Sequence, residues 1–166
     1  KRMAVDRLHI VGDIFDRGPR ADIVMDALRN YHSVDIQWGN HDILWMGAAS
    51  GSRTLVATVL ANSIHYNNLE VIETGYGISL RPLSIFANEV YKDCDTHRFA
   101  VKLTGADADQ YTEKDKLLSA RMHKAITVIL FKLEGQKLMR CPEFGMSDRL
   151  LLDKIDYENK TVTIGD

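Results

Sequence analysis

The sequence predicts an α/β fold that begins with a βαβ unit, continues through a mainly helical segment and ends in a β-hairpin. The first observation is that a strand pattern, an amphipathic helix and a second strand pattern follow one another within residues 8–38. The second is that helical periodicity dominates residues 43–133, whereas residues 149–164 contain two strand-like runs around a turn. The chain has 166 residues, of which 45% are hydrophobic and 27% are charged, so it can bury a core of its own.

The βαβ unit rests on three short patterns. The run Leu8-His9-Ile10-Val11 predicts a buried strand. Apolar residues recur at helical spacing from Ile23 to Tyr31, which indicates an amphipathic helix of about three to four turns. Alternation of apolar and polar residues from Val34 to Trp38 predicts the second strand. Because a crossover of this kind is right-handed, we expect the two strands to be parallel neighbours.

The remainder of the chain is predicted to be helical up to a C-terminal hairpin. Helices are expected at 43–49, 54–66, 80–91 and 112–133, a surface loop at 93–110, and hairpin strands at 149–155 and 161–164. Residues 127–131 also fit a strand, because β-branched and aromatic residues follow one another there. We therefore divide the chain into a βαβ core at 1–52, a mainly helical insertion at 53–140 and a hairpin at 141–166 that returns to the core.

Two polar motifs follow the two predicted strands directly. They are Gly12-Asp13-Ile14-Phe15-Asp16-Arg17-Gly18 and Gly39-Asn40-His41-Asp42. Each can be read as an ordinary turn or helix cap. However, both lie at the carboxyl ends of parallel strands, and this edge of an α/β sheet is where ligands bind. The pair therefore indicates a functional site more strongly than either motif does alone.

The residue types in these motifs suit metal-assisted chemistry at phosphorus. Hard divalent cations prefer carboxylate and amide oxygens, and a carboxylate can bridge two metals. Asp13 is the natural bridge and Asn40 suits a terminal position on one metal. Oxygen and imidazole ligands fit several divalent ions, so the residues alone leave the metal open.

The other side chains of the motifs suit phosphate binding and proton transfer. Arg17 can hold phosphate oxygens with its forked N–H groups. His41 can act as a general acid for the leaving alkoxide. Asp16 can pair with His41 and fix the orientation of its ring.

The two motifs do not complete a two-metal site, which needs about four further protein ligands. The other histidines, expected to be structural or solvent-facing, are His9, His32, His65, His97 and His123. The chain starts at Lys1 without an initiating Met and stops at Asp166 just after a predicted strand. We therefore expect it to be a fragment whose missing ligands lie outside it.

Composition excludes several other classes of function. A net charge of −2 gives no overall attraction to nucleic acid or to an anionic membrane. No apolar run approaches the ~20 residues of a transmembrane helix, and the N-terminus has no signal-peptide pattern. The only two cysteines, Cys94 and Cys141, are typical of free thiols in a reducing compartment, which favours a cytoplasmic location.

At these motifs the chain resembles the calcineurin-like metallophosphoesterases, whose fold is a two-sheet α/β sandwich. Their signature runs Asp-x-His, Gly-Asp-x-x-Asp-Arg-Gly, Gly-Asn-His-Asp/Glu and two later histidines, of which the middle two elements are present here. A narrower resemblance, to the class III fructose-1,6-bisphosphatases of Firmicutes and other bacteria, covers nearly the whole chain. It is carried by the runs 38–51, 66–69, 75–78, 131–136 and 148–157.

The resemblance implies a partial calcineurin-like sandwich with a helical insertion and a terminal hairpin. It also implies hydrolysis of the 1-phosphate of fructose 1,6-bisphosphate, a cytoplasmic step of gluconeogenesis that uses Mn²⁺ or Mg²⁺. By this resemblance Asp13 bridges the metals, Asn40 ligates one metal and Arg17 holds phosphate. His41 with Asp16 would then form the proton-donating pair. The partner is a small sugar bisphosphate, and a homo-oligomer is left open.

Two rival functions are also compatible with the sequence. Another enzyme of the superfamily, such as a protein Ser/Thr phosphatase, would share both motifs, although the run Leu44-Trp45-Met46-Gly47 argues against it. The second rival is a catalytically incomplete module that only binds. Arg81, Lys132, Lys137 and Arg140 are candidates for a second phosphate, but solvated surface charge is the simpler reading for each.

Overall fold

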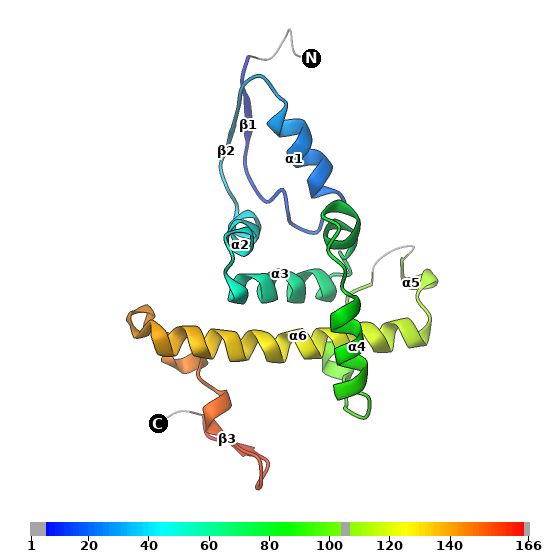
Figure 1. Cartoon of the computed structure of the whole chain (residues 1–166), viewed down its shortest axis with the longest axis vertical. Helices are drawn as coiled ribbons and strands as arrows, with labels where there is room; N and C mark the ends of the chain where they lie inside the picture. Colours follow the sequence, from blue (N-terminus) through cyan, green and yellow to red (C-terminus); the bar gives the residue numbers. More distant parts are fainter. Residues whose placement is uncertain (1–5, 104–106, 165–166) are drawn as a thin grey trace.

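The predicted βαβ unit forms at one end of the molecule (Figure 1). The structure, a computed structural model, describes residues 6–103 and 107–164. Strand β1 (Leu8–Ile10) pairs in parallel with β2 (Val34–Ile36), and α1 (Ala21–Arg29) connects them. The amide of Gln37 extends the ladder by donating to the Ile10 carbonyl at 2.9 Å. The prediction of parallel neighbouring strands is confirmed, and both motifs leave the sheet at the same edge.

The prediction that the first strand is buried is wrong for the described residues. His9 projects from an exposed face of β1 and its Nδ1 lies 2.7 Å from a carboxylate oxygen of Asp35, its register partner on β2. Val11, at the end of the strand, is 88% exposed. The described sheet has two strands, so one of its faces lacks the covering layer that a buried strand requires.

The rest of the chain is mostly helical. Its α-helices are α2 (Asn40–Ala49), α3 (Arg53–His65), α4 (Arg81–Val90), α5 (Asp107–Gln110) and α6 (Glu113–Arg140). Shorter turns are one π-helical turn (Val71–Gly75) and 3₁₀ turns at His97–Phe99, Pro142–Phe144, Ser147–Arg149 and Leu152–Lys154. The chain finishes with β3 (Ile155–Asp156) antiparallel to β4 (Thr161–Val162).

Local sequence explains where the two longest helices begin. The Ser52 hydroxyl accepts a hydrogen bond from the Leu55 amide at 3.4 Å and so caps α3. Thr112 and Asp115 form a capping box at α6, in which each side chain accepts from the other's backbone amide. Helix α6 continues to Arg140, beyond the predicted end at residue 133, and the alternative strand at 127–131 is wrong.

The hydrophobic core lies among α3, α4 and α6, within the predicted helical insertion. In Figure 1, α3 runs alongside α6 and α4 crosses it. Ala87 and Ala125 are fully buried, and their small side chains allow α4 and α6 to approach closely. The other buried core residues are Ala57, Ala61, Ile64, Ile72, Leu80, Met122 and Ile126. The segment boundaries at residues 52 and 140 stay predictions.

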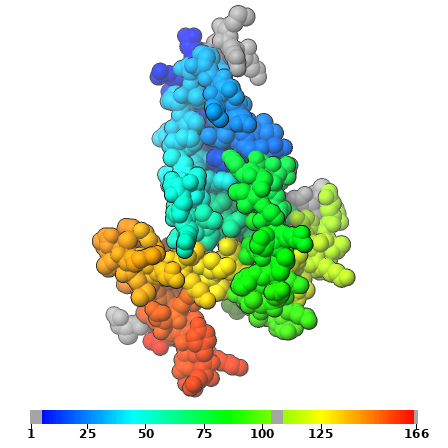
Figure 2. All heavy atoms as spheres, viewed as in Figure 1, coloured from blue at the N-terminus to red at the C-terminus, as the bar shows by residue number. Residues whose placement is uncertain are grey.

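Several elements are shorter than predicted. Helix α1 starts at Ala21 and has nine residues, and the hairpin strands have two residues each. Before the hairpin, Leu150 packs near Gly135 of α6 and Arg149 lies 3.5 Å from Glu134, so this run turns against α6 instead of extending. The predicted surface loop at 93–110 includes residues 104–106, which lie outside the described residues. The hairpin projects from the opposite end of the molecule to the βαβ unit (Figure 2).

One partly buried histidine links the two longest helices. The ring of His65, at the end of α3, lies 5.0 Å from the ring of His123 on α6, and its buried Nδ1 has no hydrogen-bond partner within the described residues. Burial lowers the pKa of His65 below the usual 6.5, and the charges of His123 and Lys102 lower it further. The neutral ring therefore fits this interface and the protonated ring does not.

We expect the stability of the chain to fall as the pH drops below 6.5. The unfolded chain binds the His65 proton more readily than the folded chain, so acid favours unfolding until the pH passes the lower, folded pKa. The free energy of unfolding should change by less than about 1.4 kcal/mol per pH unit, which is the limit for a difference of one bound proton between the unfolded and folded chains. Replacing His65 with Phe should remove most of this dependence on pH in urea unfolding curves measured from pH 5 to 7.5.

The exposed His32 provides the matched control. His32→Phe should leave the dependence on pH as it is in the parent chain. If the unfolding free energy of His65→Phe depends on pH as it does in the parent chain, the proposed role of the His65 ring is contradicted.

Candidate active site

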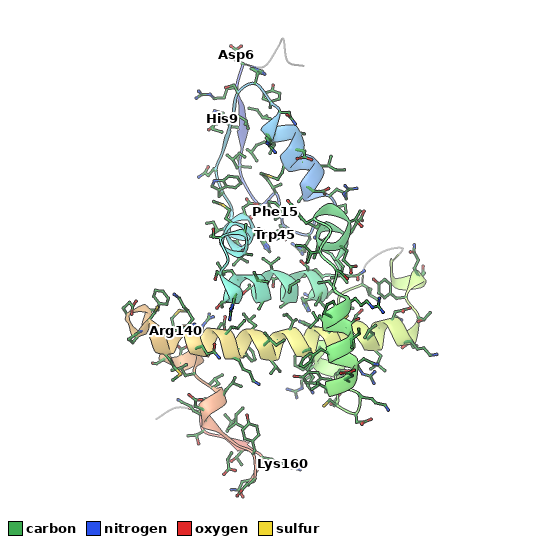
Figure 3. The ribbon with its side chains drawn as sticks, in the orientation of Figure 1. Asp6, His9, Phe15, Trp45, Arg140 and Lys160 are labelled. Carbon is green, nitrogen blue, oxygen red and sulfur yellow. The ribbon has the colours of Figure 1, made fainter. Side chains whose placement is uncertain are left out.

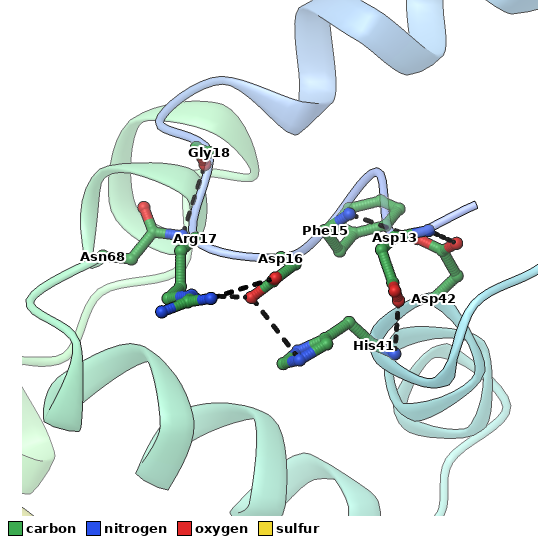
Figure 4. Close-up of polar contacts among 8 residues, drawn as sticks. All are labelled: Asp13, Phe15, Asp16, Arg17, Gly18, His41, Asp42 and Asn68. Carbon is green, nitrogen blue, oxygen red and sulfur yellow. Dashed lines mark hydrogen bonds and ion pairs between the residues drawn. The ribbon is translucent and has the colours of Figure 1, made fainter. Parts of the chain in front are cut away.

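The two motifs meet at the carboxyl end of β1 and β2 through a single buried side chain, Asp42 (Figure 4). Its carboxylate accepts hydrogen bonds from the backbone amides of Asp13 at 2.6 Å and Phe15 at 3.1 Å. It also accepts from the amide of Gly39 at 2.9 Å and so caps the start of α2. One buried carboxylate therefore fixes the backbone of both motifs.

Backbone geometry at this junction demands small residues and left-handed conformations. Gly12 has φ of +91°, and a side-chain carbon on it would lie 2.5 Å from the Gln37 carbonyl oxygen. A side-chain carbon on Gly39 would overlap the Asp13 carboxylate. Asp13 and Arg17 themselves have φ of 53° and 55°. These conformations bring the two motifs into direct contact, and the His41 amide donates to Asp13 Oδ1 at 3.2 Å.

Asp16 lies between the cationic side chains of the two motifs. Its Oδ1 is 2.9 Å from Arg17 Nε and 3.4 Å from His41 Nε2, and its Oδ2 is 3.4 Å from Arg17 Nη2. Its hydrogen bond with Arg17, together with the charge of His41, holds the pKa of Asp16 below its usual 3.8. Asp16 is therefore ionised at neutral pH.

The end of α3 supports the first motif from a distance in sequence. The guanidinium carbon of Arg17 lies 5.0 Å from the centre of the Tyr66 ring, a cation–π contact. The Asn68 side-chain amide donates to the Gly18 carbonyl at 3.3 Å. Together these contacts hold the loop over the helical core.

Aromatic side chains pack behind the site. The Phe15 ring stacks on Trp45 with centroids 4.7 Å apart, and Tyr76 lies 5.5 Å from Trp45 (Figure 3). A small hollow is lined by Arg17, His41, Tyr66 and neighbouring residues of α2 and α3, and it encloses about 20 Å³. That volume holds about one water molecule, so a larger ligand does not fit inside the hollow.

Each predicted site residue has a defined place in this arrangement. Asp13, Asp16, Arg17 and His41 are brought together by the contacts above. Asn40 is the first residue of α2 and is exposed, beside the same junction. Asp13 and Asn40 thus present oxygen donors of the kind that divalent cations prefer. Within residues 6–103 and 107–164, no group of three or more His, Cys, Asp or Glu side chains is arranged to hold a metal ion.

Sequence reasoning gave no role in the site to three residues that hold it. For Asp42, the alternative reading of the second motif as a helix cap is confirmed, but its hydrogen bonds to the first motif were not expected. Tyr66 and Asn68 have no local signal, because their role depends on the packing of α3 against the loop. His65 and His123, expected to be separate, lie against each other, whereas His97 pairs with Asp95 at 2.8 Å.

Replacing Asp42 with Ala should destabilise the chain by about 2–4 kcal/mol, because buried amides of both motifs would lose their acceptor. Asp42→Asn should have an intermediate effect, since its amide retains one acceptor oxygen. The exposed Asp26 of α1 provides the control, and Asp26→Ala should change stability by less than about 0.5 kcal/mol. The stability of all three variants is measured as the midpoint of urea unfolding, with the dependence of the unfolding free energy on urea concentration unchanged. Equal midpoints for Asp42→Ala and Asp26→Ala would contradict the central role of Asp42.

No helix of the described residues combines the length and the hydropathy that crossing a bilayer requires. Cys94 and Cys141 are both free thiols.

Comparison with known proteins identifies the family. The Firmicute fructose-1,6-bisphosphatase family matches the chain over residues 1–166. The class 3 fructose-1,6-bisphosphatases of Alkaliphilus metalliredigens, Bacteroides thetaiotaomicron and Listeria monocytogenes are 58%, 56% and 54% identical to it over 99%, 95% and 99% of its length. The matched regions are 24%, 24% and 25% of these relatives, so the chain spans about a quarter of their length. No solved structure matches the chain. The chain belongs to the Firmicute fructose-1,6-bisphosphatase family.

Proposed function

We propose that the protein carrying this chain hydrolyses the 1-phosphate of fructose 1,6-bisphosphate, giving fructose 6-phosphate and inorganic phosphate. The observation that carries the proposal is the convergence of Asp13, Asp16, Arg17 and His41 at one sheet edge, in a chain of this family. The relatives with this name support the choice of substrate. The reaction would be a gluconeogenic step in the cytoplasm, and a homo-oligomer is compatible with it.

The donor chemistry of the site fits a pair of divalent cations. Asp13 would bridge the two metals and Asn40 would ligate one of them, with Mn²⁺ as the first choice and Mg²⁺ as the second. Further ligands would come from residues outside the described set. When bound, such a pair acidifies a water molecule and offsets the negative charge of the phosphate. We also propose that the βαβ unit is part of a calcineurin-like sandwich in the whole protein.

The side chains of the loop would perform the remaining steps. Arg17 would hold the phosphate oxygens with N–H groups that Asp16 orients. His41, as the imidazolium, would donate its proton to the sugar oxygen as the P–O bond breaks, which avoids release of a free alkoxide. Asp16 would stabilise the charged ring of His41 from 3.4 Å away. One ionised carboxylate would thus position both the phosphate clamp and the proton donor.

The protein expressed from its complete reading frame should hydrolyse fructose 1,6-bisphosphate in the presence of Mn²⁺, with a kcat/KM at least 100-fold above that for a phosphoserine peptide. Phosphate release measures both substrates. A preference for the phosphopeptide would favour a protein phosphatase, and the proposal would fail. The 166-residue chain, tested alongside, should show weak or no activity with Mn²⁺, because Asp13 and Asn40 supply only part of a two-metal site. Full activity of this chain would contradict that ligand assignment.

The role of His41 predicts an effect that depends on the leaving group. His41→Asn should lower kcat for the sugar phosphate by about 10²–10⁴-fold, because the alkoxide needs a proton. For p-nitrophenyl phosphate the loss should be about tenfold or less, since nitrophenolate leaves without one. His32→Asn, on an exposed residue beyond α1, should change neither value. Equal losses on the two substrates would show that His41 does not act as the general acid.

A further inference from the structure

The ring of Tyr66 contacts two cationic side chains. The guanidinium carbon of Arg17 and the ammonium nitrogen of Lys102 are each 5.0 Å from the centre of its ring. The two charges are therefore no farther apart than twice that distance. Arg17 belongs to the first motif, whereas Lys102 comes from a segment far along the chain, so the fold brings this second cation to the site.

Lys102 is held in place by its backbone. Its amide donates to the His65 carbonyl at 2.7 Å, which ties the segment after Phe99 to the end of α3. The side chain then reaches Tyr66, the residue that follows α3. Both ends of this lysine are thus fixed to the same helix end that supports Arg17.

Arg17 and Lys102 differ in whether a carboxylate neutralises the charge of the side chain. Asp16 pairs with Arg17 through two hydrogen bonds. Among residues 6–103 and 109–164, no carboxylate forms an ion pair with the Lys102 ammonium, which contacts the Tyr66 ring. The charge of Lys102 also contributes to the lowered pKa of the neighbouring His65. A cation that no described carboxylate neutralises, beside a phosphate site, attracts a second anionic group of a ligand.

Two of the surface charges that sequence alone offered for this role, Lys137 and Arg140, make other contacts. Arg140 is at the far end of α6, well away from Phe15 of the loop (Figure 3). Its Nε donates to the Gln136 carbonyl at 3.1 Å, and Lys137 lies over the Phe144 ring. Lys102 is the candidate that shares an aromatic support with the phosphate clamp.

We propose that Lys102, presented by Tyr66, binds the second phosphate of the substrate while Arg17 holds the phosphate that is hydrolysed. This inference rests on the proposed function. An ammonium is a compact donor suited to a phosphate whose orientation need not be fixed, whereas the forked guanidinium suits the reacting phosphate. Lys102 would therefore determine the preference for a sugar bisphosphate over a monophosphate.

The test compares two substrates that differ in the second phosphate alone. In the protein expressed from its complete reading frame, KM is measured with Mn²⁺ for fructose 1,6-bisphosphate and for fructose 1-phosphate. Lys102→Gln should raise the ratio of the KM for the bisphosphate to the KM for the monophosphate about tenfold, the loss of one charge-assisted phosphate contact. An unchanged ratio would overturn the proposal, whether both KM values rise together or neither moves.

A matched control separates phosphate binding from the loss of a lysine on an aromatic surface. Lys124 lies 5.6 Å from the Tyr91 ring and 5.7 Å from the Phe99 ring, on the part of α6 that faces α4 and the 97–99 turn. Lys124→Gln removes a contact of the same kind and the same charge, and it should leave the ratio unchanged. A tenfold rise in this control as well would overturn the assignment to Lys102.

Failure of the proposed function would be visible in the parent protein. If that protein hydrolyses p-nitrophenyl phosphate but not fructose 1,6-bisphosphate, the proposed function fails. The two sugar phosphates are then compared as competitive inhibitors of p-nitrophenyl phosphate hydrolysis. A tenfold selective loss of bisphosphate affinity in Lys102→Gln would uphold the second-phosphate site, and equal affinities in variant and parent would overturn it.

Discussion

The arrangement of the site depends on one buried carboxylate, Asp42. It accepts hydrogen bonds from the amides of Asp13, Phe15 and Gly39, and its side chain is shielded from solvent. A buried charge is tolerated only when donors surround it, so the carboxylate requires both motifs to adopt their observed backbones. Asp13 can therefore take a left-handed conformation and still accept the His41 amide. Around this buried carboxylate, Asp13, Arg17 and Asn40 are exposed, whereas Asp16 and His41 are partly buried.

A second layer of support comes from the helical part of the chain. Tyr66 and Asn68, just beyond α3, contact Arg17 and the Gly18 carbonyl. Helix α3 is in turn anchored on α6 through the core around Ile64 and Ala125. Packing among the helices thus reaches the loop that carries Arg17 through Tyr66 and Asn68. The helical segment therefore has its own hydrophobic core and also supports the loop of the site.

Local sequence predicted the features that local interactions determine. The strand, helix and strand spacing gave parallel neighbours, and the two motifs indeed lie together at one edge. Predictions failed where tertiary packing decides. The run before the hairpin turns because Leu150 packs on α6, and β1 is only partly buried because the face that carries His9 is open to solvent. The contacts of Tyr66, Asn68 and Lys102 join positions roughly 35–50 residues apart, a separation at which no periodic pattern carries information. The roles assigned to the individual motif residues stay predictions.

The exposed apolar residues of the βαβ unit affect how the chain would behave in solution. Val11 and Ile23 of this unit, and Ile43 and Met46 of the adjoining α2, are about half exposed or more. Among the described residues the sheet has two strands, so each strand has an outer edge. Surfaces of this kind attract other strands and other copies of the same chain. Preparations of the 166-residue chain would therefore tend to self-associate with rising concentration. Work on the loop at residues 12–18 is better done in a longer polypeptide that covers these residues.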